Sequence, residues 1–320
     1  MKSVLVASGT ANTGNNVVRT LSASGKVHVR ALCRKPDADN AKALAALPNV
    51  TVVKGDFEDA ASLKAALAGV DRALLVSPAG DAGQYDREVA FLAAAKEAGI
   101  EGTVRISTCN VLIDPNSKGV YAQAHGKIEE WIKANNAKAH GKTEEWINAN
   151  DATVCDVCPN WFMTNVLWAM AEVKGYGSYT LPCSIPTKRK FAMIDPRDIG
   201  SAAAAILLSD KFAEFIAAGK VNVSGPAETN YSEQVDAINK AAGTSIQLKS
   251  CTADEYAAML AGAGMTEHMS TSFTATVQMC AGEIPPARPY DEATSPLLLS
   301  IWKPEFDVAA WAAASAPMFK

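Results

Sequence analysis

The feature that most constrains the fold of this chain is the alternation of short apolar runs with helical stretches over its first 110 residues. Helical patterns lie for example at 61–69 and at 87–99, where Gly99 is a typical helix stop. Strands that alternate with helices in this way predict an α/β fold with a Rossmann-like, doubly wound parallel sheet, whose ligands bind at the carboxyl ends of the strands. The runs that we expect to form these strands are 3–7, 27–33, 50–55, 72–77 and 102–107.

The second half of the chain has a less regular pattern. We expect loop and short strand over 174–190, a helix from about Asp198 to Leu208, and short strands near 219–225 and 246–251. The stretch 251–264 is typical of a capped helix that begins near Thr252 or Asp254. These patterns suggest two regions. Residues 1–155 would form the dinucleotide-binding Rossmann domain, and residues 156–320 would return in part to the sheet and form a smaller α/β substrate or partner domain.

Charge and hydropathy narrow the class of protein. The chain has 30 basic and 34 acidic residues, a net charge of −4 and no long basic block, which argues against direct contact with nucleic acid. No run reaches the ~18 apolar residues that a membrane helix needs, and the N-terminal apolar run is too short for a signal peptide. We therefore expect a soluble, cytoplasmic protein that does not span a membrane.

The cysteine pattern does not indicate a disulfide framework or a metal site. The seven cysteines are spread along the chain, and Cys155 and Cys158 form a C-x-x-C pair within an apolar strand pattern. A redox pair needs a helix N-terminus or a cation to stabilise a thiolate, and neither is evident here. We therefore expect buried, reduced thiols.

The turn "SGTANTG" at residues 8–14 follows the first predicted strand and precedes a helix. Ser8, Ala11 and Gly14 stand where a G-x-x-G-x-x-G motif has its glycines. Small residues at 8 and 11 keep the backbone accessible, Gly14 allows close packing of helix and strand, and Gly9 is expected to take the tightest dihedral angle. Such a turn can hold a pyrophosphate on its backbone N–H groups and the positive end of the helix. The alternatives are an ordinary strand-to-helix turn, and one whose nucleotide binding has been lost.

The end of the second predicted strand indicates which dinucleotide would bind. The strand ends in Arg34 and Lys35 and has no carboxylate for a ribose 2′-hydroxyl. A guanidinium suits a 2′-phosphate, so the sequence favours NADP over NAD. The alternative is a solvated basic loop.

A helical segment occurs twice, at 124–135 and 139–150, and the copies differ at two of twelve positions. On one unbroken helix, copies 15 residues apart would point about 60° away from each other, so only one copy can occupy a given site.

Tyr121 stands four residues before His125, at the spacing of the Tyr-x-x-x-Lys pair of short-chain dehydrogenases. His125 could donate a proton if a neighbour raised its pKa; the alternative is a helix-surface histidine. In the second copy His140 has Asn136 in place of the tyrosine. His125 also lies 18 positions after Ser107, whereas His140 lies 33 positions after it. We expect the first copy to face the cofactor; the alternative is the second copy, which leads more directly into the next predicted strand.

Taken in order, these blocks resemble the NmrA-like family of atypical short-chain dehydrogenase/reductases over nearly the whole chain. The blocks are 8–18, 29–37, 52–78, 93–100, 124–132, 158–167 and 194–207. The resemblance implies that the first turn holds the pyrophosphate, that Arg34 and Lys35 take the 2′-phosphate, and that Asp56 and Phe57 lie along the adenine. It also implies that Ser77 and Pro78 lie beside the nicotinamide ribose and that 159–162 meets the carboxamide. The residues expected to bind NADP(H) are Ser8, Gly9, Thr10, Asn12, Thr13, Gly14, Arg34, Lys35, Asp56, Phe57, Ser77, Pro78, Ser107, Pro159, Asn160, Trp161 and Phe162.

Two functions remain open from the sequence. In the first, the protein is an NADPH-dependent oxidoreductase that reduces a small carbonyl, quinone or conjugated apolar compound, with Tyr121 or His125 as proton donor. Trp161, Phe162 and Met163 could then line an apolar pocket, although core packing explains them equally well. In the second, the protein is a redox sensor that binds NADP(H) without turnover and acts through a protein partner.

Overall fold

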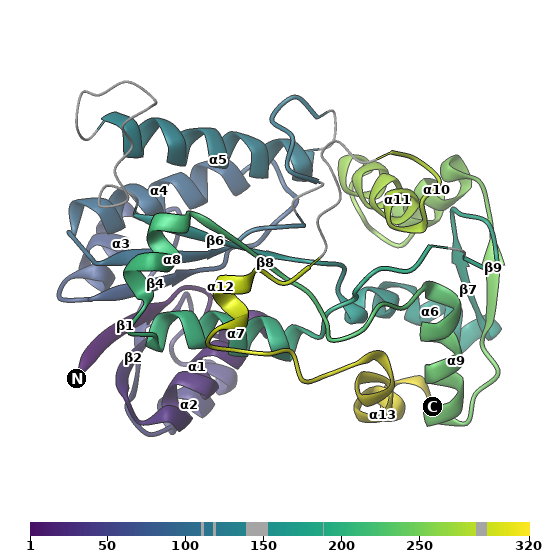
Figure 1. Cartoon of the computed structure of the whole chain (residues 1–320), viewed down its shortest axis with the longest axis horizontal. Helices are drawn as coiled ribbons and strands as arrows, with labels where there is room; N and C mark the ends of the chain where they lie inside the picture. The colour runs from purple at the N-terminus through teal and green to yellow at the C-terminus, as the bar shows by residue number, and fades with distance from the viewer. Residues whose placement is uncertain (110–111, 118–119, 139–152, 188, 286–292) are drawn as a thin grey trace.

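The strands of the first region join strands of the second in one large parallel sheet (Figure 1). The computed structural model describes residues 1–109, 112–117, 120–138, 153–187, 189–285 and 293–320. The sheet has seven strands in the order β3-β2-β1-β4-β5-β6-β8, which confirms the doubly wound α/β prediction. The strands are β1 (Lys2–Val6), β2 (Val27–Cys33), β3 (Val50–Lys54), β4 (Arg72–Leu75), β5 (Gly102–Ile106), β6 (Val154–Pro159) and β8 (Lys220–Val223).

Helices cover both faces of this sheet, and the strand residues alternate between the two cores. In β1, Val4 and Val6 pack against the helices of one face, whereas Leu5 packs against those of the other. The first face carries α1 (Asn12–Ser24), α2 (Asp39–Ala45), α7 (Pro196–Leu208) and α8 (Phe212–Ala218), with the short α12 (Pro296–Leu299) nearby. The second face carries α3 (Ala60–Leu67), α4 (Gln84–Glu97) and α5 (Val120–Lys138).

The helices begin and end where local chemistry allows. Asp59 accepts hydrogen bonds from backbone N–H groups at the start of α3, and Asp195 does so at the start of α7, where Pro196 is the first helical residue. Gly25, just after α1, has a φ of 63°, and Gly99, just after α4, has a φ of 66°. Gly99 therefore lies beyond the end of its helix, as expected.

A smaller core lies beyond the carboxyl ends of the sheet strands. Its two-stranded parallel sheet joins β7 (Ser178–Leu181) and β9 (Gln247–Ser250). Thr252 caps helix α10 (Ala253–Gly262) in a capping box with Glu255, so the predicted start of this helix is confirmed. The short strands expected near 219–225 and 246–251 are β8 and β9. The helices of this core are η3 (Met163–Ala169), α6 (Met170–Tyr176), α9 (Tyr231–Ala242), α10 (Ala253–Gly262), α11 (Glu267–Ala281) and α13 (Val308–Phe319).

Two further sequence predictions can be located in this fold. Cys155 and Cys158 lie in the fully buried β6 and are reduced, and burial raises the pKa of both thiols. The first copy of the duplicated segment lies in α5, whereas the second copy, with His140, falls outside the described residues. Within the described part of the chain, no helix is both long and apolar enough to cross a membrane.

Candidate functional site

The turn between β1 and α1 is tight, but its strain lies at a different residue from the one expected. Ser8 has a φ of 50°, in the left-handed region, whereas Gly9 has no positive φ. The expectation that Gly9 takes the tightest dihedral angle was therefore wrong; Gly9 instead lies against β2, where an added Cβ would lie 3.0 Å from the Cβ of Ala31. At Gly14 an added Cβ would lie 2.3 Å from the carbonyl oxygen of Ser8. Only glycine fits at position 14 without moving the turn.

The N-terminus of α1 leaves hydrogen-bonding capacity for an anion. Ala11 precedes the helix with extended backbone, no side chain caps the helix, and its first turn has no acidic residue. Thr13 is buried in this first turn. Unused N–H groups and the positive end of the helix dipole both favour a phosphate here.

A polar cavity of about 410 Å³ adjoins this helix end. It extends from Thr10 and Asn12 of the turn to Asp195 and Arg197 at the start of α7. Arg197 donates to both carboxylate oxygens of Asp195, which fixes the guanidinium at the cavity wall. The remaining lining residues are Asn15, Asn16, Thr164, Pro196, Trp311, Ala314 and Ser315.

The carboxyl ends of β2 and β3 place the expected adenosine-side residues in different surroundings. Arg34 and Lys35 are both exposed just after β2. Asp56 is half-buried and accepts a hydrogen bond from the N–H of Glu58 at 3.2 Å. Phe57 is a core residue, with its ring centroid 6.0 Å from that of Phe91. Its burial leaves little of the ring for contact with a ligand.

A second, apolar cavity of about 200 Å³ lies at the carboxyl ends of β4, β5 and β6. Half-buried Tyr121, from the start of α5, and the expected segment 159–162 meet in its wall. Asn160 Oδ1 accepts from the N–H of Trp161 at 2.7 Å, and the Trp161 ring packs edge-on against Tyr231. The lining residues are Ala79, Thr108, Cys109, Leu112, Tyr121, Pro159, Asn160, Trp161, Phe162, Asn165, Trp168, Met265, Met269, Ser272, Phe273, Thr276, Met279 and Cys280.

Helix α11 covers this cavity. We did not predict this helix from the sequence. Its N-terminal cap is Thr266, whose side chain accepts from the N–H of Met269. Met269 also lies against the β4–α4 loop, because a Cβ at Gly80 would lie 2.0 Å from its sulfur. The signal was present in the spacing, since cavity-lining residues recur every three or four positions at 265, 269, 273, 276 and 280.

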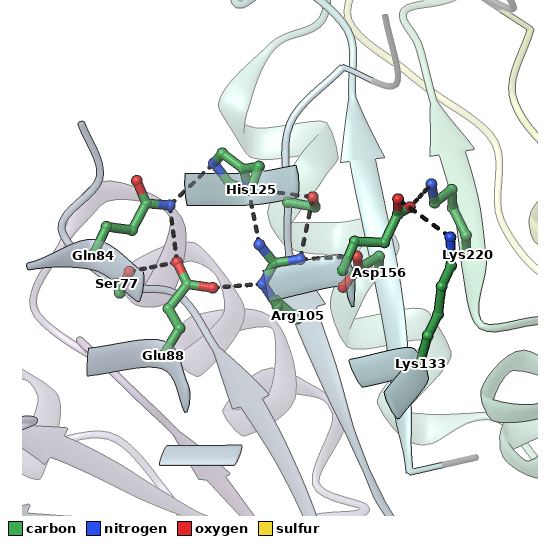
Figure 2. Close-up of polar contacts among 10 residues, drawn as sticks. Ser77, Gln84, Glu88, Arg105, His125, Lys133, Asp156 and Lys220 are labelled. Atoms are coloured by element: carbon green, nitrogen blue, oxygen red, sulfur yellow. Dashed lines mark hydrogen bonds and ion pairs between the residues drawn. The ribbon is translucent and has the colours of Figure 1, made fainter. Parts of the chain in front are cut away.

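Behind the cavity lies a buried group that we call the charged cluster: Glu88, Arg105, His125 and Asp156 (Figure 2). Arg105 of β5 and Asp156 of β6 are register partners in the sheet, and both point to the face covered by α4 and α5. Arg105 Nη1 donates to Asp156 Oδ2 at 2.8 Å, and Arg105 Nε donates to Glu88 Oε2 at 2.5 Å. We did not predict this cluster from the sequence. The sequence signal for it was a single charged residue in the middle of each of two apolar strand patterns, Arg105 in β5 and Asp156 in β6.

Burial and pairing set the protonation of the charged cluster. Burial alone would raise the pKa of Glu88, but the positive charge of Arg105 and the hydrogen bonds from Arg105 and Gln84 lower it below its ordinary value. Burial raises the pKa of Asp156 in spite of Arg105, and Asp156 Oδ1 has no hydrogen-bond partner. Arg105 itself is fully buried, and its two carboxylate partners raise its pKa. The guanidinium therefore stays charged.

His125 belongs to this cluster, which corrects the expectation that a neighbour could raise its pKa. Burial, together with the positive charge of Arg105, lowers the pKa of His125 to about 3. Arg105 Nη2 lies 2.8 Å from His125 Nδ1, and because a guanidinium only donates, Nδ1 accepts. The amide nitrogen of Gln84 lies 3.1 Å from Nε2 on the other side of the ring. His125 is thus a neutral, buried ring that does not line the cavity, rather than a helix-surface histidine or a protonated donor.

Two serines that were expected beside the cofactor contact the charged cluster. Ser77 Oγ donates to Glu88 Oε1 at 2.8 Å (Figure 2). Ser107 Oγ lies 3.3 Å from Arg105 Nη1. Pro78, next to Ser77, is exposed. Tyr121 joins the cluster to the cavity, because its ring packs edge-on against His125 with 4.7 Å between centroids. Burial raises the pKa of Tyr121 to about 12, so its hydroxyl stays protonated at neutral pH.

Comparison with known proteins finds relatives that match most of the length of this chain. A model of the NmrA-like family matches residues 1–295. An NAD(P)H azoreductase of Xenophilus azovorans is 28% identical over 273 residues, which cover 83% of each chain. The structure of an NADPH-dependent quinone oxidoreductase of Escherichia coli in complex with NADPH is similar, with a TM-score of 0.72 at 19% identity, over 97% of this chain and 99% of that one. NmrA, a negative transcriptional regulator solved in complex with NADP, has a TM-score of 0.72 at 14% identity, over 99% and 96%.

Proposed function

This chain belongs to the NmrA-like family, and we propose that within it the protein is an NADPH-dependent reductase of flat, conjugated oxidants such as quinones or azo compounds. The observation that carries the proposal is the apolar cavity at the carboxyl ends of β4 to β6, with Tyr121 in its wall. In doubly wound folds, ligands bind at this edge of the sheet. The names of the azoreductase and quinone oxidoreductase relatives support the same substrate class.

The residues of the β1–α1 turn fit a dinucleotide. The uncapped N-terminus of α1 and the glycine at position 14 suit a pyrophosphate. Arg34 and Lys35, both exposed after β2, would hold a 2′-phosphate, which supports NADP(H) over NAD(H). When bound, NADPH supplies a hydride to the substrate. The chain's own residues orient the substrate and exclude water from the cavity.

The acid–base properties of the site narrow the substrate class. Reduction of a simple ketone produces a basic alkoxide, which calls for a good general acid. Neither candidate has the near-neutral pKa that favours this role, because the pKa of His125 is about 3 and that of Tyr121 is about 12. A quinone is reduced to a resonance-stabilised, weakly basic anion that water can protonate. The Tyr121 hydroxyl would then act as a hydrogen-bond donor that orients the substrate oxygen.

NADPH oxidation with a panel of quinones, azo compounds and simple ketones tests the proposal. We expect turnover with the first two classes and little with the third. In Arg34→Ala, loss of a charge-assisted contact worth roughly 1.5–3 kcal/mol should raise the KM for NADPH about 10- to 100-fold and leave that for NADH unchanged. Lys26→Ala is the matched control, because it removes an exposed charge just before β2 instead of just after it.

A second candidate function is redox sensing without turnover. It is favoured by the histidine that stands four residues after Tyr121, in the charged cluster, where short-chain dehydrogenases have a lysine. The likeness to a transcriptional regulator solved with NADP also supports it. Tight NADPH binding without oxidation by any compound of the panel would favour the sensor. Absence of NADPH binding would rule out both functions.

A further inference from the structure

Trp168 of η3 is a large aromatic side chain that the fold leaves in solvent. It is 66% exposed, although it also lines the apolar cavity. Among the described residues, Tyr176 is the other strongly exposed aromatic side chain, and it does not line the cavity. Because Trp168 is exposed at the edge of a pocket, its indole face is available to a ligand that enters the cavity.

The cavity opens beside Trp168. Of its lining residues, Trp168 and Ala79 are the exposed ones, which places both at the mouth. The inner wall is fixed, because Trp161 is buried between Tyr231 and Phe273, with centroid distances of 6.1 and 5.3 Å. A long ligand would therefore extend outward, through the mouth that Trp168 and Ala79 line.

The size of the cavity makes this extension relevant to substrate choice. Its volume of about 200 Å³ is below the ~300–1,000 Å³ typical of pockets that enclose a drug-sized ligand. A single-ring quinone fits inside such a volume. A compound with a second, attached aromatic ring would leave that ring at the mouth, next to the exposed indole.

We propose that Trp168 is a specificity-determining residue, whose indole stacks on the second aromatic ring of a substrate while the reducible ring enters the cavity beside Tyr121. This inference rests on the proposed function. It adds a substrate class, namely extended two-ring oxidants, and a residue that distinguishes them from single-ring ones. Face contact with a flat ring is favourable because indole offers a large polarisable surface at little conformational cost.

Steady-state kinetics with methyl-1,4-benzoquinone and phenyl-1,4-benzoquinone test the inference, because the two differ in the attached group and share the reducible ring. In Trp168→Ala we expect the KM for the phenyl compound to rise about three- to tenfold, as for loss of one aromatic pair, and that for the methyl compound to stay within about twofold. Trp168→Phe should restore most of the preference. Tyr176→Ala, the matched exposed aromatic, should change neither KM, and the KM for NADPH should stay constant throughout.

An equal effect on both quinones, or no effect on either, overturns the role of Trp168 and leaves the proposed function standing. If the wild-type protein reduces neither compound and no quinone or azo compound of the panel, the proposed function fails, and equilibrium titration of the two quinones into the NADP-loaded protein then tests the stacking contact by itself. Selective loss of affinity for the phenyl compound in Trp168→Ala supports the stacking contact. Equal affinities, or binding of neither compound, overturn it.

Discussion

The apolar cavity and the charged cluster are built from the same two strands, yet they have opposite chemistry. Beyond its carboxyl end, β5 leads into Thr108 and Cys109 of the cavity wall, and within its length it carries the buried Arg105. Likewise β6 ends at Pro159 in the cavity and carries Asp156 in its interior. One turn of α5 separates Tyr121 of the cavity from His125 of the cluster. The comparison suggests that paired charges hold the strands and helices in place, while the ligand surface itself is nearly free of charge.

The largest expected effect comes from removing the charge at the centre of the cluster. Arg105→Leu removes the guanidinium that pairs with both buried carboxylates, Glu88 and Asp156, and we expect a loss of about 3–5 kcal/mol in the free energy of unfolding, measured by urea denaturation. Arg19→Leu, on the exposed side of α1, should change it by less than about 0.5 kcal/mol. A loss below about 1 kcal/mol in Arg105→Leu would show that the cluster does not stabilise the fold in this way.

The next effect is a dependence of stability on pH. The folded-state pKa of His125, about 3, lies below the ~6.5 of an unfolded chain, so the unfolded state takes up the proton first as the pH falls. Stability that is fully present above pH ~6.5 is therefore lost on acidification, by about 1–2 kcal/mol between pH 7 and pH 5. Urea denaturation of His125→Gln should lack this component, and His28→Gln, a half-buried histidine of β2, should retain it. The same pH dependence in His125→Gln would place its source elsewhere.

A smaller effect is expected from removal of the hydroxyl of Tyr121, a residue of the apolar cavity wall. Because the pKa of Tyr121 is about 12, its hydroxyl should not titrate between pH 6 and 9, and kcat for quinone reduction should be level over this range. Tyr121→Phe should lower kcat by no more than about tenfold, since one neutral hydrogen bond is lost. Tyr176→Phe serves as the control. A drop of more than about 100-fold in Tyr121→Phe would instead identify a general acid, and would bring proton chemistry into the cavity.

The smallest effect is expected at the cover of the cavity. Met269→Leu keeps the volume and the apolar character of a half-buried side chain, so the KM for the quinones should change by less than about twofold.

The comparable conservative change in the charged cluster is Arg105→Lys. It keeps the charge but loses the planar guanidinium that joins Glu88, Asp156 and His125. We expect Arg105→Lys to lower the free energy of unfolding clearly, as measured by urea denaturation. Equal tolerance of both changes would break the contrast between the two regions.

Much of the sheet was predictable because its signals are local. Each of the five strands expected before residue 110 is present, and the bounds differ by at most two residues. The start of α10 near Thr252 or Asp254 and the helix stop at Gly99 could also be predicted, since capping depends on a few neighbouring residues; the structure then shows that Thr252 is the cap. The turn at 8–14 was recognised, but the position of its strain was not, because φ at Ser8 depends on how closely Gly14 packs against its carbonyl.

The sequence by itself determined the order of strands and helices along the first 110 residues, the buried nature of β6, and the presence of a glycine-poor turn between β1 and α1. These follow from periodicity and turn chemistry within short stretches. Only the tertiary structure decided that Arg105 meets Asp156, 51 residues later, and that α11 closes a cavity around Tyr121, more than 140 residues earlier. Such meetings depend on strand register and helix packing, which join distant segments. For the same reason, the pKa of His125 follows from its buried neighbours and not from its place after Tyr121.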